Sequence, residues 1–230
     1  MFNYFYNKSL RKTVVGFGSL FNNIHVEHAN PDETLSPLRI RVPITYAPQE
    51  KFIRRYLEPS SITDTTRLEN QLPRLSYIMT SIVSDPSRRK NKLGKIKKSI
   101  DAQGNCTNPA SIISQEVPVN ITFSLFIYTR HIDDTLQIVE QIVPYFNPEH
   151  IITLDLNDVA TDVKIPITMV NNNISERFDG DFGTRRINIS SFNFLVKSYI
   201  FGKIEEQTSI TSSNDNVSFD LDYTVDTDAT

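Results

Sequence analysis

The sequence predicts an α+β protein: a mostly antiparallel β-sheet with about three helices packed on it, a basic loop, and a flexible acidic C-terminal tail. Several segments alternate apolar and polar residues with a period of two, which is typical of half-buried strands, and three others repeat apolar residues at helical spacing. Most neighbouring predicted strands have no helix between them, which favours an antiparallel sheet over a parallel doubly wound one.

Residues 117–148 are the stretch around which we expect the fold to be organised. Their first half alternates as a strand and their second half has an apolar stripe at helical spacing, wide enough to lie on a sheet. Asp133 and Asp134 fall in the first turn of this helix, where the helix dipole favours carboxylates, and Pro144 and Pro148 close it.

The first elements of the chain are predicted as a helix over residues 9–21 and a short strand over 23–28. Ser9 is placed as a helix N-cap, while Gly16 and Gly18 have low helix propensity. The helix is favoured because its apolar residues recur three and four positions apart.

A clean alternating strand is predicted over residues 38–46, and Pro43 within it indicates an edge strand or a bulge because proline has no N–H for a central ladder. A helix over 48–57 follows, starting at a proline that suits the first turn. The strand at 72–83 is apolar on both faces and is therefore predicted to be central.

The second half of the chain is predicted to hold three more strands, at residues 152–156, 163–169 and 186–201. Residues 171–183 are polar and rich in turn formers. In the last strand the apolar phase slips by one residue, which we attribute to a bulge near Ser190 or Ser191.

The predicted domain organisation is one α+β domain over residues 1–204, with a long basic loop inserted at 85–109, and an acidic extension over 205–230. The extension has seven acidic residues and no basic one, whereas the rest of the chain has 24 basic and 20 acidic residues. A body of this length can bury a core without disulfides, and Cys106, as the single cysteine, cannot form an internal one. No secretory signal is recognised and the longest apolar run is too short to span a bilayer, so we expect the protein to remain in the cytoplasm where it is made.

The basic segment is the strongest electrostatic signal. Seven cationic side chains fall within eleven residues: Arg88, Arg89, Lys90, Lys92, Lys95, Lys97 and Lys98. Such a segment can bind a phosphate backbone or an acidic protein surface, or it can be a solvated loop. No aromatic residue interleaves the charges to stack on a base, so direct contact with DNA is not favoured.

Enzymatic chemistry is weakly supported. Asp133 with Asp134, and Asp179 with Asp181, are the candidate carboxylates of a metal-dependent hydrolase, but a hydrolytic two-metal site needs several carboxylates converging in a cleft. The four histidines have no ligand spacing except His25 and His28, which point to opposite faces of a strand, and no phosphate-binding or nucleophile motif occurs. We therefore predict no enzyme activity, no catalytic residue, no metal and no cofactor.

Several co-linear blocks resemble a known family. They are Tyr4-Phe5-Tyr6-Asn7 with Arg11, the run from Arg41 to Ala47, Leu72-Pro73-Arg74, the stretch from Tyr128 to Pro148, and Asp179-Gly180-Asp181 with Arg185-Arg186. Together they resemble the tail sheath stabilisers, or tail completion proteins, of contractile-tailed bacteriophages (myoviruses). The resemblance covers residues 1 to about 200, with the basic segment and the tail outside it.

The resemblance implies a structural virion protein that caps the completed tail as a hexameric ring. It implies binding to the sheath protein and the tube terminator protein, an attachment surface for the neck proteins of the head, and a place at the head-proximal end of the tail. Neither a membrane nor direct DNA contact is implied. We place candidate anchors at Arg41, Arg130, Asp133 and Asp134, together with the basic segment. The alternative from the residues alone is a nucleic-acid-binding module that uses residues 88–98.

Overall fold

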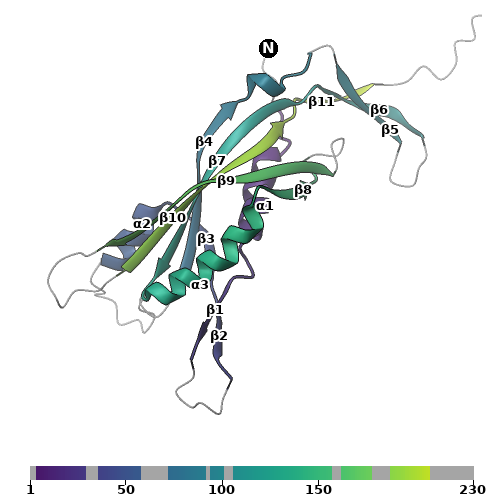
Figure 1. The fold of residues 1–230 in the computed structure, drawn as a ribbon. Helices are drawn as coiled ribbons and strands as arrows, with labels where there is room; N and C mark the ends of the chain where they lie inside the picture. Colours follow the sequence, from purple (N-terminus) through teal and green to yellow (C-terminus); the bar gives the residue numbers. More distant parts are fainter. Residues whose placement is uncertain are drawn as a thin grey trace, which may run out of the picture.

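A six-stranded sheet forms the body of the protein. The computed structural model describes residues 4–29, 36–57, 72–91, 94–100, 106–156, 162–177 and 187–207. The strand order across the sheet is β3 (Ile44–Tyr46), β4 (Arg74–Ser84), β7 (Val117–Thr129), β10 (Ile187–Ile200), β9 (Val163–Arg177) and β8 (His150–Leu154). All neighbours are antiparallel except β3 and β4, and the sheet is strongly curled (Figure 1). The predicted α+β class is confirmed.

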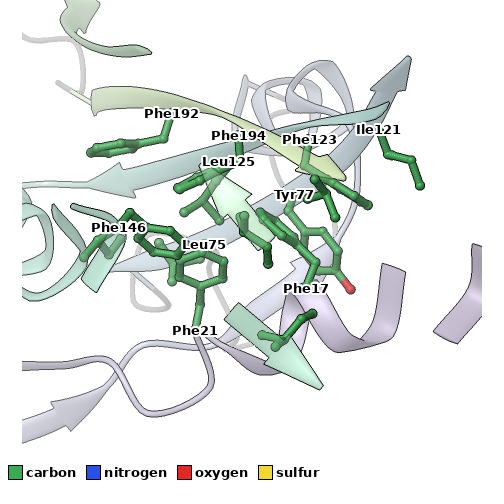
Figure 2. Packing of buried hydrophobic residues seen from close by; sticks show 14 of the residues in the cluster. Phe17, Phe21, Leu75, Tyr77, Ile121, Phe123, Leu125, Phe146, Phe192 and Phe194 are labelled. Atoms are coloured by element: carbon green, nitrogen blue, oxygen red, sulfur yellow. The ribbon is translucent and has the colours of Figure 1, made fainter. Parts of the chain in front are cut away.

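One face of the sheet is covered by α1 (Ser9–Ser19) and α3 (Ile132–Ile142), the latter continued by a 3-10 turn, η3 (Val143–Phe146). Phe17 of α1 stacks on Phe123 of β7 with ring centroids 4.4 Å apart, and Phe21 and Phe146 meet beside it at 6.0 Å. Figure 2 shows these rings converging with Phe194 in one cluster. Each fully buried side chain of this size contributes about 1.5–3 kcal/mol relative to exposure, so this face carries most of the core.

Gly18 is a weak helix former that lies on the buried side of α1, and its contact with Tyr77 explains why glycine is found there. A Cβ atom at this position would collide with the hydroxyl of Tyr77, which donates a 3.2 Å hydrogen bond to the carbonyl of Val14. The low helix propensity of glycine is therefore offset by the close approach of α1 to β4.

The other face of the sheet is covered at one end by α2 (Gln49–Leu57), as predicted from residues 48–57. Phe52 stacks on Tyr128 with a centroid separation of 4.0 Å, and the hydroxyl of Tyr128 lies 3.1 Å from that of Ser76. Burial raises the pKa of Tyr128 to about 12. Ile187 and Ile189 complete this second, smaller cluster.

The prediction of a bulge in β10 near Ser190 or Ser191 is wrong. β10 pairs with β7 without a break from Asn188 to Ile200. The apolar phase changes because the two ends of β10 face different helices: Ile187 and Ile189 belong to the α2 side, whereas Phe192, Phe194 and Val196 belong to the α1 and α3 side. An irregularity does occur opposite Asn193 and Phe194, but it lies on β9, at Val170.

The strand predicted over residues 38–46 is two strands in different sheets. β2 (Leu38–Arg41) pairs with β1 (His25–His28) as a hairpin, and β3 is the edge strand of the main sheet. The break falls at Val42 and Pro43, which confirms the edge position inferred from the proline.

A second, three-stranded sheet has the order β11 (Ile204–Gln207), β6 (Cys106–Ser114), β5 (Lys95–Ile100). We call this sheet the arm. It leaves the body at the end opposite to the β1–β2 hairpin (Figure 1).

The arm shows that the expectation of a loop over residues 85–109 is wrong. A 3-10 turn, η2 (Pro86–Arg88), β5 and the start of β6 lie there. The missed strands lack a clean alternation of apolar and polar residues, which is the signal by which the other strands were predicted. Residues 171–177, expected to be turns, likewise continue β9.

The division into residues 1–204 and 205–230 stays a prediction. β11 spans that boundary, and the acidic residues after 207 lie outside the part that the structure describes. In the same described ranges, no helix is long and apolar enough to cross a membrane.

Candidate functional site

The predicted basic segment begins where β4 leaves the main sheet, and its first cation is held by the protein's own fold. The Arg88 guanidinium donates to Asp85 Oδ2 at 2.8 Å, to Asn120 Oδ1 at 2.7 Å and to the carbonyl of Val119 at 3.2 Å. It also lies over the ring of Tyr199, 5.4 Å from the centroid. Arg88 thus connects η2 to β7 and β10. We call this cluster the Asp85 corner.

Asp85 is the acceptor of the corner. Its Oδ1 accepts from the backbone N–H and the hydroxyl of Ser87, and its Oδ2 also accepts from the Asn120 amide at 3.2 Å. The Ser87 hydroxyl and the Arg88 guanidinium hold the pKa of this carboxyl well below its usual range. Asp85 thus stays ionised, and the corner sets the direction in which the chain enters the arm.

The next cations of the segment also have partners. The guanidinium of Arg89 donates to the Ser84 hydroxyl at 2.8 Å, and Lys90 Nζ lies 2.6 Å from Glu116 Oε1. The Glu116 carboxylate raises the pKa of Lys90. Because Lys90 is 64% exposed, the energy of this pair is screened by water, but Glu116 is only 12% exposed and holds its position.

The remaining cations of the segment belong to the arm or lie outside the described residues. Lys95 begins β5 and is exposed, and Lys97 and Lys98 lie in the same edge strand, with only their backbone described. Lys92 lies outside the described residues. The structure therefore divides the segment, with Arg88 to Lys90 engaged at the base of the arm and the lysines of β5 along its edge.

The second candidate region is the contact between α3 and the β1–β2 hairpin. Gln137 Oε1 accepts from the N–H of Glu27 at 2.9 Å, and Gln137 Nε2 donates to the carbonyl of the same residue at 3.0 Å. Gln141 makes the same two bonds with His25, at 3.3 and 2.7 Å. Side-chain amides four residues apart on α3 thus take the place of a neighbouring strand, and they close the outer edge of β1. We call this contact the glutamine ladder.

Asp134 extends the ladder by one helical turn. Its Oδ1 lies 2.8 Å from Nε2 of His28, and its side chain is 5% exposed. Asp133 is exposed, so the two adjacent carboxylates that were predicted as one anchor point in different directions.

The structure does not bring the predicted anchors together. Arg41 donates from Nε to the carbonyl of Asn22 at 2.7 Å, within its own hairpin region. Arg130 is exposed at the turn before α3. Whether Arg41, Arg130 and Asp133 contact another subunit stays a prediction, whereas Asp134 contributes to the fold.

Gln137 and Gln141 were missed by sequence reasoning, because glutamine on the polar side of a helix is usually solvated. The one signal was their four-residue spacing beside Asp134. The structure also bears on metal binding: within the described ranges, no group of three His, Cys, Asp or Glu side chains could hold a metal ion.

Comparison with known proteins gives two matches. The family described as T4-like virus Myoviridae tail sheath stabiliser matches residues 4–229 of the chain. The tail completion protein gp15 of Enterobacteria phage T4 is 31% identical over 214 residues, which is 90% of this chain and 75% of that protein. The family match includes the basic segment and almost the entire acidic tail, which the resemblance of short sequence blocks had left out.

Proposed function

The chain belongs to the T4-like Myoviridae tail sheath stabiliser family, and from this premise we propose that it forms a ring that caps the completed contractile tail. Membership confirms the resemblance seen in the sequence, and it confirms a structural tail completion protein of the myovirus virion that associates with the tail sheath and is not an enzyme. The ring, its position and its further partners are the proposed part.

In the proposal, the ring is hexameric and sits at the head-proximal end of the tail, assembled in the host cytoplasm. It contacts the last sheath ring and the tube terminator protein, and it offers the attachment surface for the neck proteins. The support from the structure is the placement of two projections, the hairpin and the arm, at opposite ends of the body (Figure 1). A subunit with different surfaces at its two ends makes heterologous contacts, and these close into a ring when the rotation allows.

A cap of this kind stabilises an extended sheath by binding it more tightly than the contracted one. A ligand shifts a two-state equilibrium only by its difference in affinity for the two states. The relevant property of the cap is therefore a rigid binding surface that fits one geometry of the last sheath ring.

Both projections are held rigidly where they join the body. The Asp85 corner fixes the base of the arm with charge-assisted hydrogen bonds, and the glutamine ladder fixes the hairpin against α3. Pre-organised surfaces lose less conformational entropy on binding, so these contacts favour tight association with sheath and neighbours.

The proposal is tested with tails assembled with and without the protein. Electron microscopy should show a terminal ring only on tails that received the protein, and those tails should remain extended for longer and join heads. Tails that stay extended and join heads equally well without the protein would refute the capping role. A ring seen at the baseplate end would refute the proposed position.

A further inference from the structure

The N-terminal segment before α1 exposes three consecutive aromatic side chains. Tyr4 is 92% exposed, Phe5 49% and Tyr6 58%. Single exposed apolar residues are ordinary on protein surfaces, but a contiguous aromatic run marks an interaction site. We call residues 4–6 the aromatic run.

The base of the aromatic run is tied to the body. The side-chain amide of Asn7 donates to the carbonyl of Phe201 at 3.1 Å and to that of Gly202 at 2.6 Å. The run is therefore presented from a fixed point at the end of β10, at the side of the molecule from which the arm leaves.

An apolar groove of about 330 Å³ lies at the opposite end of α1, between that helix and α3 with η3. Its apolar lining is Leu20, Phe21, Ile24, Ile142, Tyr145 and Phe146. Most of these side chains are buried and form its floor, whereas Tyr145 is 68% exposed and stands at its rim. Asn23, Gln141 and His150 add polar groups around the opening.

The aromatic run does not occupy the groove of its own subunit. Asn7 is fixed at one end of α1, and the groove begins at Leu20 at the other end, about 18 Å along the helix at about 1.5 Å per residue. Tyr4, the member of the run farthest from Asn7, lies three residues before it, which is about 10 Å of extended chain, and its side chain is 92% exposed. The run is therefore exposed at one end of α1, and the groove at the other end is lined by none of its residues.

We propose that the aromatic run of one copy of this protein docks into the groove of a second copy. The inference rests on the proposed ring and names the contact that would build it. The run and the groove are different surfaces at opposite ends of α1, so the contact is heterologous, and each subunit can use its run on one neighbour and its groove on the other. Aromatic anchors that fill a neighbour's pocket are the usual energetic centre of such interfaces.

The size of the contact makes it an anchor and not a whole interface. Burying two aromatic side chains removes about 300–500 Å² from water, whereas a stable interface buries about 800 Å² per partner. The rest of the area has to come from surfaces around the run and the groove, so removal of the run should weaken association strongly without unfolding the subunit.

A tryptophan reporter tests the docking in the full chain, because the protein has no tryptophan of its own. Tyr145→Trp places a single indole at the rim of the groove. Its emission should shift to shorter wavelength as the protein is concentrated and oligomers appear by light scattering. The further changes Tyr4→Ser, Phe5→Ser and Tyr6→Ser should raise the association midpoint at least tenfold. The matched control is Val15→Ser with Val170→Ser, which removes exposed apolar side chains elsewhere and should leave the midpoint unchanged.

A mixing experiment tests the head-to-tail geometry. One variant lacks the run (Tyr4→Ser, Phe5→Ser, Tyr6→Ser), and the other has a blocked groove through two exposed lining residues (Asn23→Lys, Tyr145→Lys). At the concentration of the wild-type association midpoint, each variant alone should be monomeric, and the mixture should form a one-to-one heterodimer that grows no further. A variant without the run that self-associates at the wild-type midpoint, or a mixture that stays monomeric there, would overturn the inference.

The outcome is separable from that of the proposed function. Wild-type chains that remain monomeric at all concentrations, or chains without the run that cap tails as well as wild type, would overturn the docking contact alone. Failure of wild-type chains to cap tails at all would overturn the proposed function itself.

Discussion

Replacing Gln141 by Met should loosen the β1–β2 hairpin without unfolding the sheet. Methionine keeps the length and helix propensity of glutamine but removes both hydrogen bonds to His25, the 3.3 Å bond from its N–H and the 2.7 Å bond to its carbonyl. A net hydrogen bond is worth about 1 kcal/mol, so the local cost is about 2 kcal/mol.

Amide hydrogen exchange measures this loss directly, because the N–H of His25 donates to Gln141 Oε1. A cost of about 2 kcal/mol corresponds to an approximately 30-fold faster exchange at His25, with a smaller rise at Glu27, whose N–H is held by Gln137. Amides of β7 should keep their protection, since the opening is local.

The matched control is Glu140→Met, an exposed position on the same helix. Gln141→Glu is a second comparison: it keeps an acceptor for the N–H of His25 but loses the donor for its carbonyl, so it should fall between wild type and Gln141→Met. Exchange at His25 within twofold of wild type in Gln141→Met would refute the view that side-chain amides hold this strand edge.

Three further outcomes are expected. Arg88→Met should lower the free energy of unfolding in urea by about 2 kcal/mol, because it removes hydrogen bonds to a charged group and leaves Asp85 without its cation. The Asp85 side chain is only 13% exposed. A loss of stability equal to that of Arg89→Met would contradict this expectation. Since the pKa of Asp85 is lower in the folded than in the unfolded state, its contribution is present above about pH 4 and is lost as the pH falls below that value, so Asp85→Asn should flatten the acid limb of the stability profile. Phe52→Ala should lower the free energy of unfolding by about 3–5 kcal/mol and lower the pKa of Tyr128 from about 12 toward 10, as followed by ultraviolet titration. Because this pKa is higher in the folded than in the unfolded state, the stability of the wild-type protein should fall as the pH rises from 10 to 12. An unchanged titration of Tyr128 in the variant would show that α2 does not bury its hydroxyl.

Much of the fold could be predicted in segments whose apolar residues repeat with a clear helical or strand period. Residues 117–148 were predicted as a strand followed by a helix, and the structure has β7 and α3 there. Each element buries one side against the core, so the spacing of its apolar residues identifies the element type and its buried side. Pro43 indicated an edge for a reason that is local to the residue, since it has no N–H to donate.

Predictions failed where a pattern had two physical causes. The phase change in β10 could come from a bulge or from cover on both faces, and the choice depended on where α2 packs. The strands of the arm were missed because the sequences of β5 and β6 do not alternate apolar and polar residues cleanly, although the two strands pair along their backbones.

The sequence identified most of the predicted site residues as charged side chains, but it did not identify the residues that they contact. The basic segment was recognised from composition, yet the fold uses Arg88 and Lys90 internally. The ladder residues Gln137 and Gln141 had no distinguishing composition, and only the return of the hairpin to α3 makes them strand partners.

By itself the sequence determined the class of the fold, the order of most elements and the family. The first two follow from the local periodicity of apolar residues, and the family follows from short motifs that occur in the same order along the chain. The tertiary structure alone decided which polar groups are engaged and which apolar side chains are left exposed. The reason is separation along the chain: Arg88 and Asn120 are 32 residues apart, and Gln141 and His25 are 116 apart. A hydrogen bond depends on atoms within about 3 Å, and only the folding of the sheet brings such residues to that distance.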